Sequence, residues 1–148
     1  MARVDYFAIE EAIRTQLKAD TDTVKSHILI EPDAAQLPAG GDAIAIYLDR
    51  RDAPQELQNL AAGLRTRFLV TFSIWCFHFA LMQKAEFEKR DDLVSQVELA
   101  LMTDRTLSGA VDTSWLSGGE FFNSRTNDQD IFMLGAEVIL TCQVTADA

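Results

Sequence analysis

Cysteine, proline and glycine are all scarce in this chain of 148 residues, which contains 2, 3 and 7 of them respectively. This composition excludes a disulfide-stapled secreted fold, a collagen-like fibre and a low-complexity disordered chain. Hydrophobic residues make up 48% and charged residues 24%, as in ordinary globular proteins. We therefore expect residues 1–148 to form a single domain around one core.

Basic residues are also few, with 13 Lys and Arg against 23 Asp and Glu, so the formal net charge is −10. Affinity for nucleic acid comes mainly from clustered Lys and Arg side chains that contact phosphate, and the sequence has no such cluster. The balance of charge therefore argues against a broad phosphate-binding surface.

Targeting signals and long apolar runs are missing as well. The N-terminus lacks the apolar core of a signal peptide, and polar residues interrupt the longest apolar stretch, Phe68–Met82. Both cysteines lie in apolar, strand-like runs, which predicts buried thiols in a reducing compartment. The sequence thus predicts a protein made in a cytoplasm, with neither a signal peptide nor a membrane span.

Motifs with a known catalytic mechanism are absent, namely a glycine-rich phosphate loop, G-x-S-x-G, H-E-x-x-H and C-x-x-C. Their absence argues against an enzyme.

Hydrophobic periodicity predicts two helices. Apolar residues at Ile9, Ile13 and Leu17 follow the 3.6-residue repeat within Tyr6–Lys18, and Asp5 is placed to cap the first turn. The second helix, Glu86–Met102, has acidic residues near its start, where the helix dipole favours them. We expect its buried side to be formed by Leu93, Val94, Val97, Ala100 and Leu101.

Alternation with a period of two predicts the strands. The predicted strands are Ile28–Pro32, Ala43–Asp49, a long Arg65–Phe79 and a long Ile131–Thr145. We interpret Trp115–Phe122 as a turn that runs into a short strand, Asp33–Asp42 and Asn123–Asp130 as loops, and Arg50–Pro54 as a segment that turns away from the sheet. The pattern of Gln55–Gly63 fits either a short helical turn or an extended loop, and the sequence does not decide between these two interpretations.

This order of elements predicts an α+β fold. Most connections are short enough for antiparallel pairing, so we expect a single mixed, mostly antiparallel β-sheet with the two helices packed on one face. The Arg65–Phe79 strand is unusually long, and we expect it to protrude.

Cys76 and His78 form the one pair that suggests chemistry, because strand alternation places both side chains on the same face. We favour the interpretation that they continue the core face, since buried structural cysteines are common and inert. A zinc set of His27, Cys76, His78 and Cys142 lacks the close paired spacing of structural zinc sites. The acidic residues Glu88, Asp91 and Asp92 are explained as the solvated first turn of a helix.

Two groups of residues are candidates for a subunit or partner interface. Arg50 and Arg51, with Arg65 and Arg67 facing the same way if their strands pair, form the only basic group that offers contacts to phosphate or to acidic residues; solvated strand ends are the alternative. Trp115 and Leu116 lie on the predicted turn, where an oligomer contact and a plug into the core remain equally open.

The segment Asp91–Asp112 resembles the tail terminator (tail completion) proteins of long-tailed bacteriophages, in which such a helix runs into a D-R-T-L-x-G-x-V stretch. The first helix, the strand Ile44–Arg51 and the final strand Gly135–Val144 are similar to the same family plan, so the likeness covers nearly the whole chain. It rests on element order and one short motif.

The resemblance implies a structural virion protein without cofactor or chemistry. It implies a homo-hexameric ring that caps the head-proximal end of the tail tube, stops tube polymerisation and joins the tail to the head. The implied partners are the tail tube protein, the head-to-tail connector and, in a contractile tail, the sheath protein, and DNA passes through the lumen without specific binding. An acidic subunit suits such a lumen.

Two alternatives stay open at this point. One is another phage neck, head-to-tail connector or baseplate protein. The other, from a different class, is a small enzyme or ligand-binding domain that uses Cys76 and His78.

Overall fold

The computed structural model describes residues 4–20, 27–33, 41–52, 55–59, 63–80, 87–125 and 132–147. Its elements, in chain order, are α1 (Tyr6–Asp20), β1 (Ile28–Ile30), β2 (Gly41–Arg51), β3 (Gln55–Asn59), β4 (Gly63–Ala80), α2 (Phe87–Thr103), β5 (Thr113–Gly118), β6 (Phe121–Arg125) and β7 (Phe132–Asp147). The expected α+β class is confirmed. None of the described helices has the length and apolar character needed to cross a membrane.

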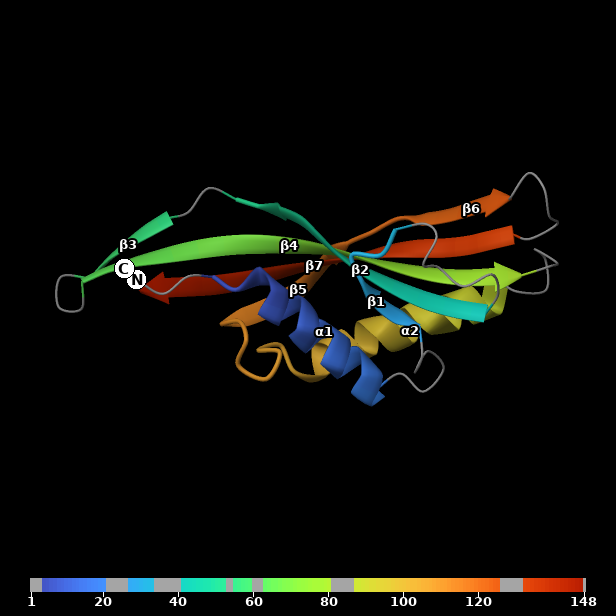
Figure 1. The fold of residues 1–148 in the computed structure, drawn as a ribbon, viewed down its shortest axis with the longest axis horizontal. Helices are drawn as coiled ribbons and strands as arrows, with labels where there is room; N and C mark the ends of the chain where they lie inside the picture. The colour runs from blue at the N-terminus through green and yellow to red at the C-terminus, as the bar shows by residue number, and fades with distance from the viewer. Residues whose placement is uncertain are drawn as a thin grey trace.

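A long antiparallel ribbon of β4 and β7 runs the length of the molecule (Figure 1). The 7-stranded sheet has the order β1-β2-β4-β7-β5, with β3 paired to β4 and β6 paired to β7. Only the β1–β2 pair is parallel among these pairings, so the sheet is mixed and mostly antiparallel, as expected. At one end, β3 and the adjoining ends of β4 and β7 extend past the helices (Figure 1), which agrees with the expected protrusion.

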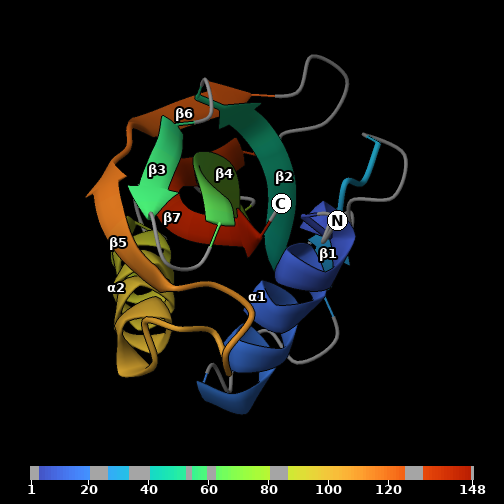
Figure 2. The same cartoon turned by 90° about the vertical axis from the view of Figure 1, so that its left-hand side faces the viewer.

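Both helices pack on the same face of this sheet (Figures 1 and 2). In α1, Ile9, Ile13 and Leu17 are buried, and the carboxylate of Asp5 accepts a hydrogen bond from the Ala8 amide at 3.0 Å. The cap satisfies an otherwise orphaned amide of the first turn. The five expected core residues of α2 are all buried as well.

The long strand β4 presents two different faces, as its alternation predicts. Val70, Phe72, Ile74 and Cys76 point toward the helices and are fully buried. On the opposite face lies a second, smaller cluster, whose buried residues are Ala43, Ala45 and Phe77. Five partly buried residues pack against it: Tyr47, Trp75, Phe79, Phe122 and Met133. The aromatic rings of Trp75, Phe77 and Phe79 are stacked along the strand.

Several sequence predictions need correction. The segment Gln55–Asn59 is a strand, β3, because its backbone pairs with β4. Strand β2 continues through Arg51 instead of turning away after Asp49, and Asn123–Arg125 belong to β6 instead of a loop. Trp115 and Leu116 lie in the strand β5, because pairing with β7 satisfies their backbone groups.

Two parts of the predicted loops lie outside the described residues. They are residues 126–130 of the Asn123–Asp130 loop and residues 34–40 of the Asp33–Asp42 loop. Asp42 itself belongs to β2.

Candidate functional site

The turn after α2 contains the motif that carries the family resemblance, and Asp104 organises it. The Asp104 carboxylate accepts hydrogen bonds from the Thr106 amide at 2.9 Å, the Thr106 hydroxyl at 2.7 Å and the Ser108 amide at 3.0 Å. These bonds, those from Thr106 first, lower the pKa of Asp104. Asp104 therefore holds the turn in its ionised form.

The same turn has an unusual backbone. Leu107, Ser108 and Gly109 all have positive φ, with values of 50°, 57° and 87°. Non-glycine residues seldom adopt this conformation, so two in succession require support from the surrounding structure. The Leu107 side chain provides it, because it is only 1% exposed and belongs to the main core.

Side chains from α1 and β5 donate hydrogen bonds to backbone carbonyl oxygens at this turn. Gln16 of α1 donates to the carbonyl oxygens of Asp104 at 3.1 Å and Ala100 at 2.8 Å. Ser114 of β5, only 1% exposed, donates to the carbonyl oxygen of Arg105 at 2.8 Å. The motif is therefore a structural junction that joins α1, α2 and β5, and each of its hydrogen bonds is explained by the fold.

Cys76 and His78 lie on the helix-facing side of β4, as their spacing predicts. The structure adds Asp42, which lies opposite His78 on β2 and whose Oδ1 contacts His78 Nδ1. A carboxylate that orients an imidazole beside a thiol has the composition of a catalytic triad.

The state of the thiol does not suit a nucleophile. Cys76 is fully buried, and burial first, then the charges of Glu98 and Asp42, raise its pKa far above the ordinary range. Burial likewise raises the pKa of Cys142 to about 12. Both cysteines are free, and Cys142 lies opposite Val70 and not opposite Cys76. The geometry supports structural thiols, which are protonated at neutral pH.

The zinc set and the acidic cluster receive no support as ligand sites. Among the described residues, no group of three or more His, Cys, Asp and Glu side chains is arranged to hold a metal ion. Asp91 and Asp92 are exposed on the first turns of α2, and the Asp91 carboxylate accepts a hydrogen bond from Arg90 at 3.0 Å.

The four arginines do not form one basic surface. Arg50 pairs with Asp52 at 2.6 Å, whereas Arg51 donates to the Tyr6 hydroxyl at 3.4 Å and so lies on the α1 side of the sheet. Arg50 and Arg51 therefore point to opposite faces of β2, because neighbouring residues of a strand alternate. Arg67 is partly buried, and the Arg65 side chain lies outside the described part of the structure.

Trp115 and Leu116 separate in the same manner. Leu116 packs against the main core, whereas Trp115 is 39% exposed and lies opposite Thr141 of β7. Leu116 therefore fits the interpretation as a plug into the core. The exposed ring of Trp115 stays a candidate for an oligomer contact.

Sequence reasoning missed a pocket at the edge of the sheet. The pocket has a volume of about 260 Å³ and lies between α2 and the β5–β6 connection. Its lining consists of Val94, Glu98, Leu116, Gly118, Gly119, Phe121, Glu137 and Val138. The adjacent Gly118 and Gly119 were the signal of this pocket in the sequence, because two glycines leave a strand end without side chains to fill the space.

Comparison with known proteins gives little. No family model matches the chain, and no curated protein matches it. Among solved structures, the chain is similar to one from the "Virion of native gene transfer agent (GTA) particle", with 15% identity and a TM-score of 0.42. That alignment covers 93% of this chain and 95% of the other.

Proposed function

We propose that this protein is a phage tail terminator, a structural virion protein that forms a hexameric ring on the head-proximal end of the tail tube. In this role it stops tube polymerisation, contacts the head-to-tail connector and performs no catalysis. The observation that carries the proposal is the D-R-T-L-S-G-A-V stretch from Asp104 to Val111, which resembles the family motif and forms the junction of α1, α2 and β5.

The physical character of the subunit supports this role. A ring through which DNA slides benefits from subunits that do not bind phosphate, and the net charge of −10 supplies such a surface. Among the described strands, β1 and β5 stand at the two ends of the pairing order, and contacts with a neighbouring subunit would cover the unpaired backbone groups of such edge strands.

The first test is the mass of the native particle, measured by light scattering at several concentrations and followed by negative-stain imaging. We expect a ring of about six times the chain mass of 16.5 kDa, in solution or on the tube. Incubation with purified tail tube protein should then give tubes that are capped at one end and stop growing. Tubes that continue to lengthen would contradict the terminator role and favour another neck or baseplate protein.

A further inference from the structure

The pocket beside α2 has the size and lining of a socket for a protein side chain. We call it the α2 socket. Val94, Leu116 and Val138 make it apolar, and Phe121, 64% exposed, stands at its rim. Its volume of about 260 Å³ lies below the roughly 300–1,000 Å³ typical of small-molecule sites, so it suits a single large side chain.

The backbone keeps this socket open. Gly118 and Gly119 contribute no side chains to it, and both have positive φ. A Cβ atom at Gly119 would lie 1.7 Å from the carbonyl oxygen of Glu137, so this position accepts no larger residue without displacing β7. The opening is therefore built into the β5–β6 connection.

The socket also carries an available negative charge. The Glu98 side chain lines it from α2 and is exposed, and within the described ranges it forms no ion pair. Glu120, also exposed, lies in the connection beside it. An occupant that combines an apolar side chain with a positive charge would match both features.

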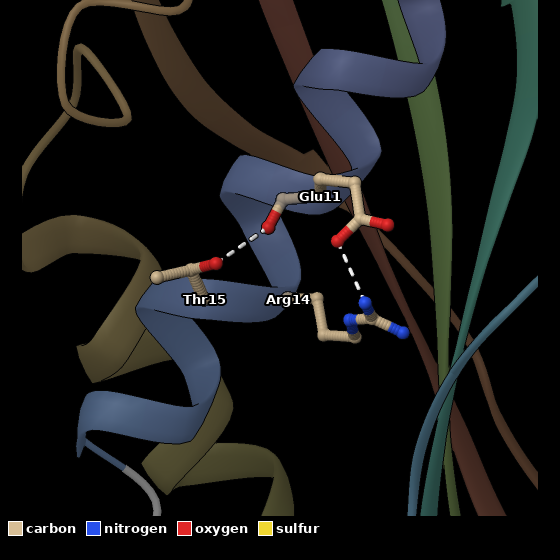
Figure 3. Close-up of polar contacts among 3 residues, drawn as sticks. All are labelled: Glu11, Arg14 and Thr15. Atoms are coloured by element: carbon tan, nitrogen blue, oxygen red, sulfur yellow. Dashed lines mark hydrogen bonds and ion pairs between the residues drawn. The ribbon is translucent and has the colours of Figure 1, made fainter.

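The outer flank of α1 offers that combination. Phe7, Glu11, Arg14 and Lys18 follow helical spacing along one side of α1, and we call them the α1 stripe. Phe7 is 61% exposed although it is a large apolar residue. Arg14 pairs with Glu11 at 2.7 Å (Figure 3), whereas Lys18 has no ion-pair partner in the described part of the chain. The stripe thus combines one exposed aromatic ring, an internal ion pair and the unpaired positive charge of Lys18.

The two surfaces lie on opposite sides of the subunit. Gln16, on the inner flank of α1, donates to the carbonyl oxygen of Ala100 in α2, so the α1 stripe lies on the flank away from α2. Figure 2 shows α2 beneath β5 at one side and α1 beside β1 and β2 at the other. Complementary surfaces on opposite sides allow a head-to-tail contact, which generates a ring when the rotation closes.

We propose that the α2 socket of one copy receives the α1 stripe of the next copy, with Phe7 entering the socket and Lys18 complementing the acidic surface of which Glu98 is part. This contact rests on the proposed ring and names the surfaces that build it. Its occupant is a second copy of this chain, because the same molecule carries both halves with opposite charge and exposed apolar residues.

The test is photo-crosslinking of the full-length protein with p-benzoylphenylalanine in place of Phe121. We expect crosslinked dimers whose peptides, identified by mass spectrometry, join position 121 to residues 4–20 of another copy. The matched control carries the same group in place of Trp115, which is exposed on the opposite face of the sheet, and should not crosslink to α1. Absence of intermolecular crosslinks, or crosslinks to other segments, would overturn the contact.

Charge reversal gives a second, independent readout. Glu98→Arg changes an exposed helix residue, and circular dichroism would verify that the variant folds. We expect it to reduce the crosslink yield about fivefold, because reversal replaces the attraction between two exposed charges with repulsion. Adding Lys18→Glu should restore part of the yield, and an unchanged yield in the single variant would contradict the charge complementarity.

The outcomes separate this contact from the terminator role. A particle of ring mass whose crosslinks lie elsewhere would overturn the contact and leave the terminator proposal standing. Crosslinks to α1 in a ring that never caps tubes would support the contact and contradict the terminator role. A crosslink from position 121 to the tail tube protein alone would overturn a second copy as the occupant.

Discussion

At the scale of single residues, the structure explains side chains that the sequence presents as candidates for chemistry. Cys76 and His78 share a face of β4, and Asp42 contacts His78, yet Cys76 is fully buried among core residues. A buried thiol stays protonated and out of reach of a substrate. The arrangement is best explained as packing, with the Asp42–His78 contact linking the ends of β2 and β4.

Thiol labelling tests that interpretation against the enzyme or ligand-binding alternative. We expect native Cys76 and Cys142 to react with iodoacetamide at least about a hundredfold more slowly than in the denatured chain, because burial removes both access and thiolate. Mass spectrometry after timed quenching measures the two rates. Rapid labelling of Cys76 alone would revive the reactive-pair hypothesis.

Gly119 offers a second prediction with a control one residue away. Gly119→Ala should lower the free energy of unfolding by about 3 kcal/mol or more, because the new methyl group would collide with the backbone of β7. Gly118→Ala also places a side chain at positive φ, but nothing lies within 4 Å, so about 1–2 kcal/mol is expected. Urea unfolding of both variants measures the difference, and equal losses would argue against the clash.

At the scale of elements, α1 and the end of β1 bring two acidic side chains together. Glu10 is 5% exposed, its carboxyl lies near that of Glu31, which follows β1, and its Oε2 has no hydrogen-bond partner among the described residues. Glu31 Oε1 also accepts the Leu48 amide at 2.7 Å. Burial first, then the negative charges of Glu31 and Glu11, raise the pKa of Glu10 to about 7. A protonated Glu10 satisfies this pair best.

This pair predicts a pH dependence of stability. A raised folded-state pKa stabilises the fold below the unfolded value of 4.5, and this contribution is lost as pH rises through about 7. The loss amounts to up to about 3 kcal/mol, at 1.36 kcal/mol per pKa unit. Glu10→Gln cannot ionise, so its free energy of unfolding should vary less with pH between 4.5 and 8.

The neighbouring carboxylate provides the control for this measurement. Glu11→Gln removes a half-exposed charge that pairs with Arg14 (Figure 3), and it should leave most of the wild-type pH dependence in place. Denaturant unfolding at four or five pH values compares the three proteins. Parallel curves for the wild type and Glu10→Gln would show that Glu10 does not ionise in this range.

At the scale of the whole molecule, two properties bear on assembly. The chain has a net charge of −10, which disfavours phosphate binding on any broad surface. Phe7 of α1 is 61% exposed, and Phe121 of β6, which lines the α2 socket, is 64% exposed. The proposed head-to-tail contact uses both of these residues.

Local patterns in the sequence determined most of the elements. Helical spacing at Ile9, Ile13 and Leu17 and two-residue alternation along β4 and β7 predicted these elements and their buried faces correctly. Each depends on a long run with one consistent period, and such a run is readable without knowledge of its neighbours. Short segments such as Gln55–Asn59 and Thr113–Gly118 lacked that length, and pairing with a long strand decided that they form β3 and β5.

Only the tertiary structure decided which residues meet. The α2 socket joins α2, β5, β6 and β7, and the acid pair joins Glu10 to Glu31 across two elements. The directions of Arg50 and Arg51 depended on the register of β2 against β4 and on the irregularity after Leu48. The sequence by itself thus determined composition, charge and the periodic elements. Contacts between distant segments required the fold, because they depend on distances in space that no local pattern encodes.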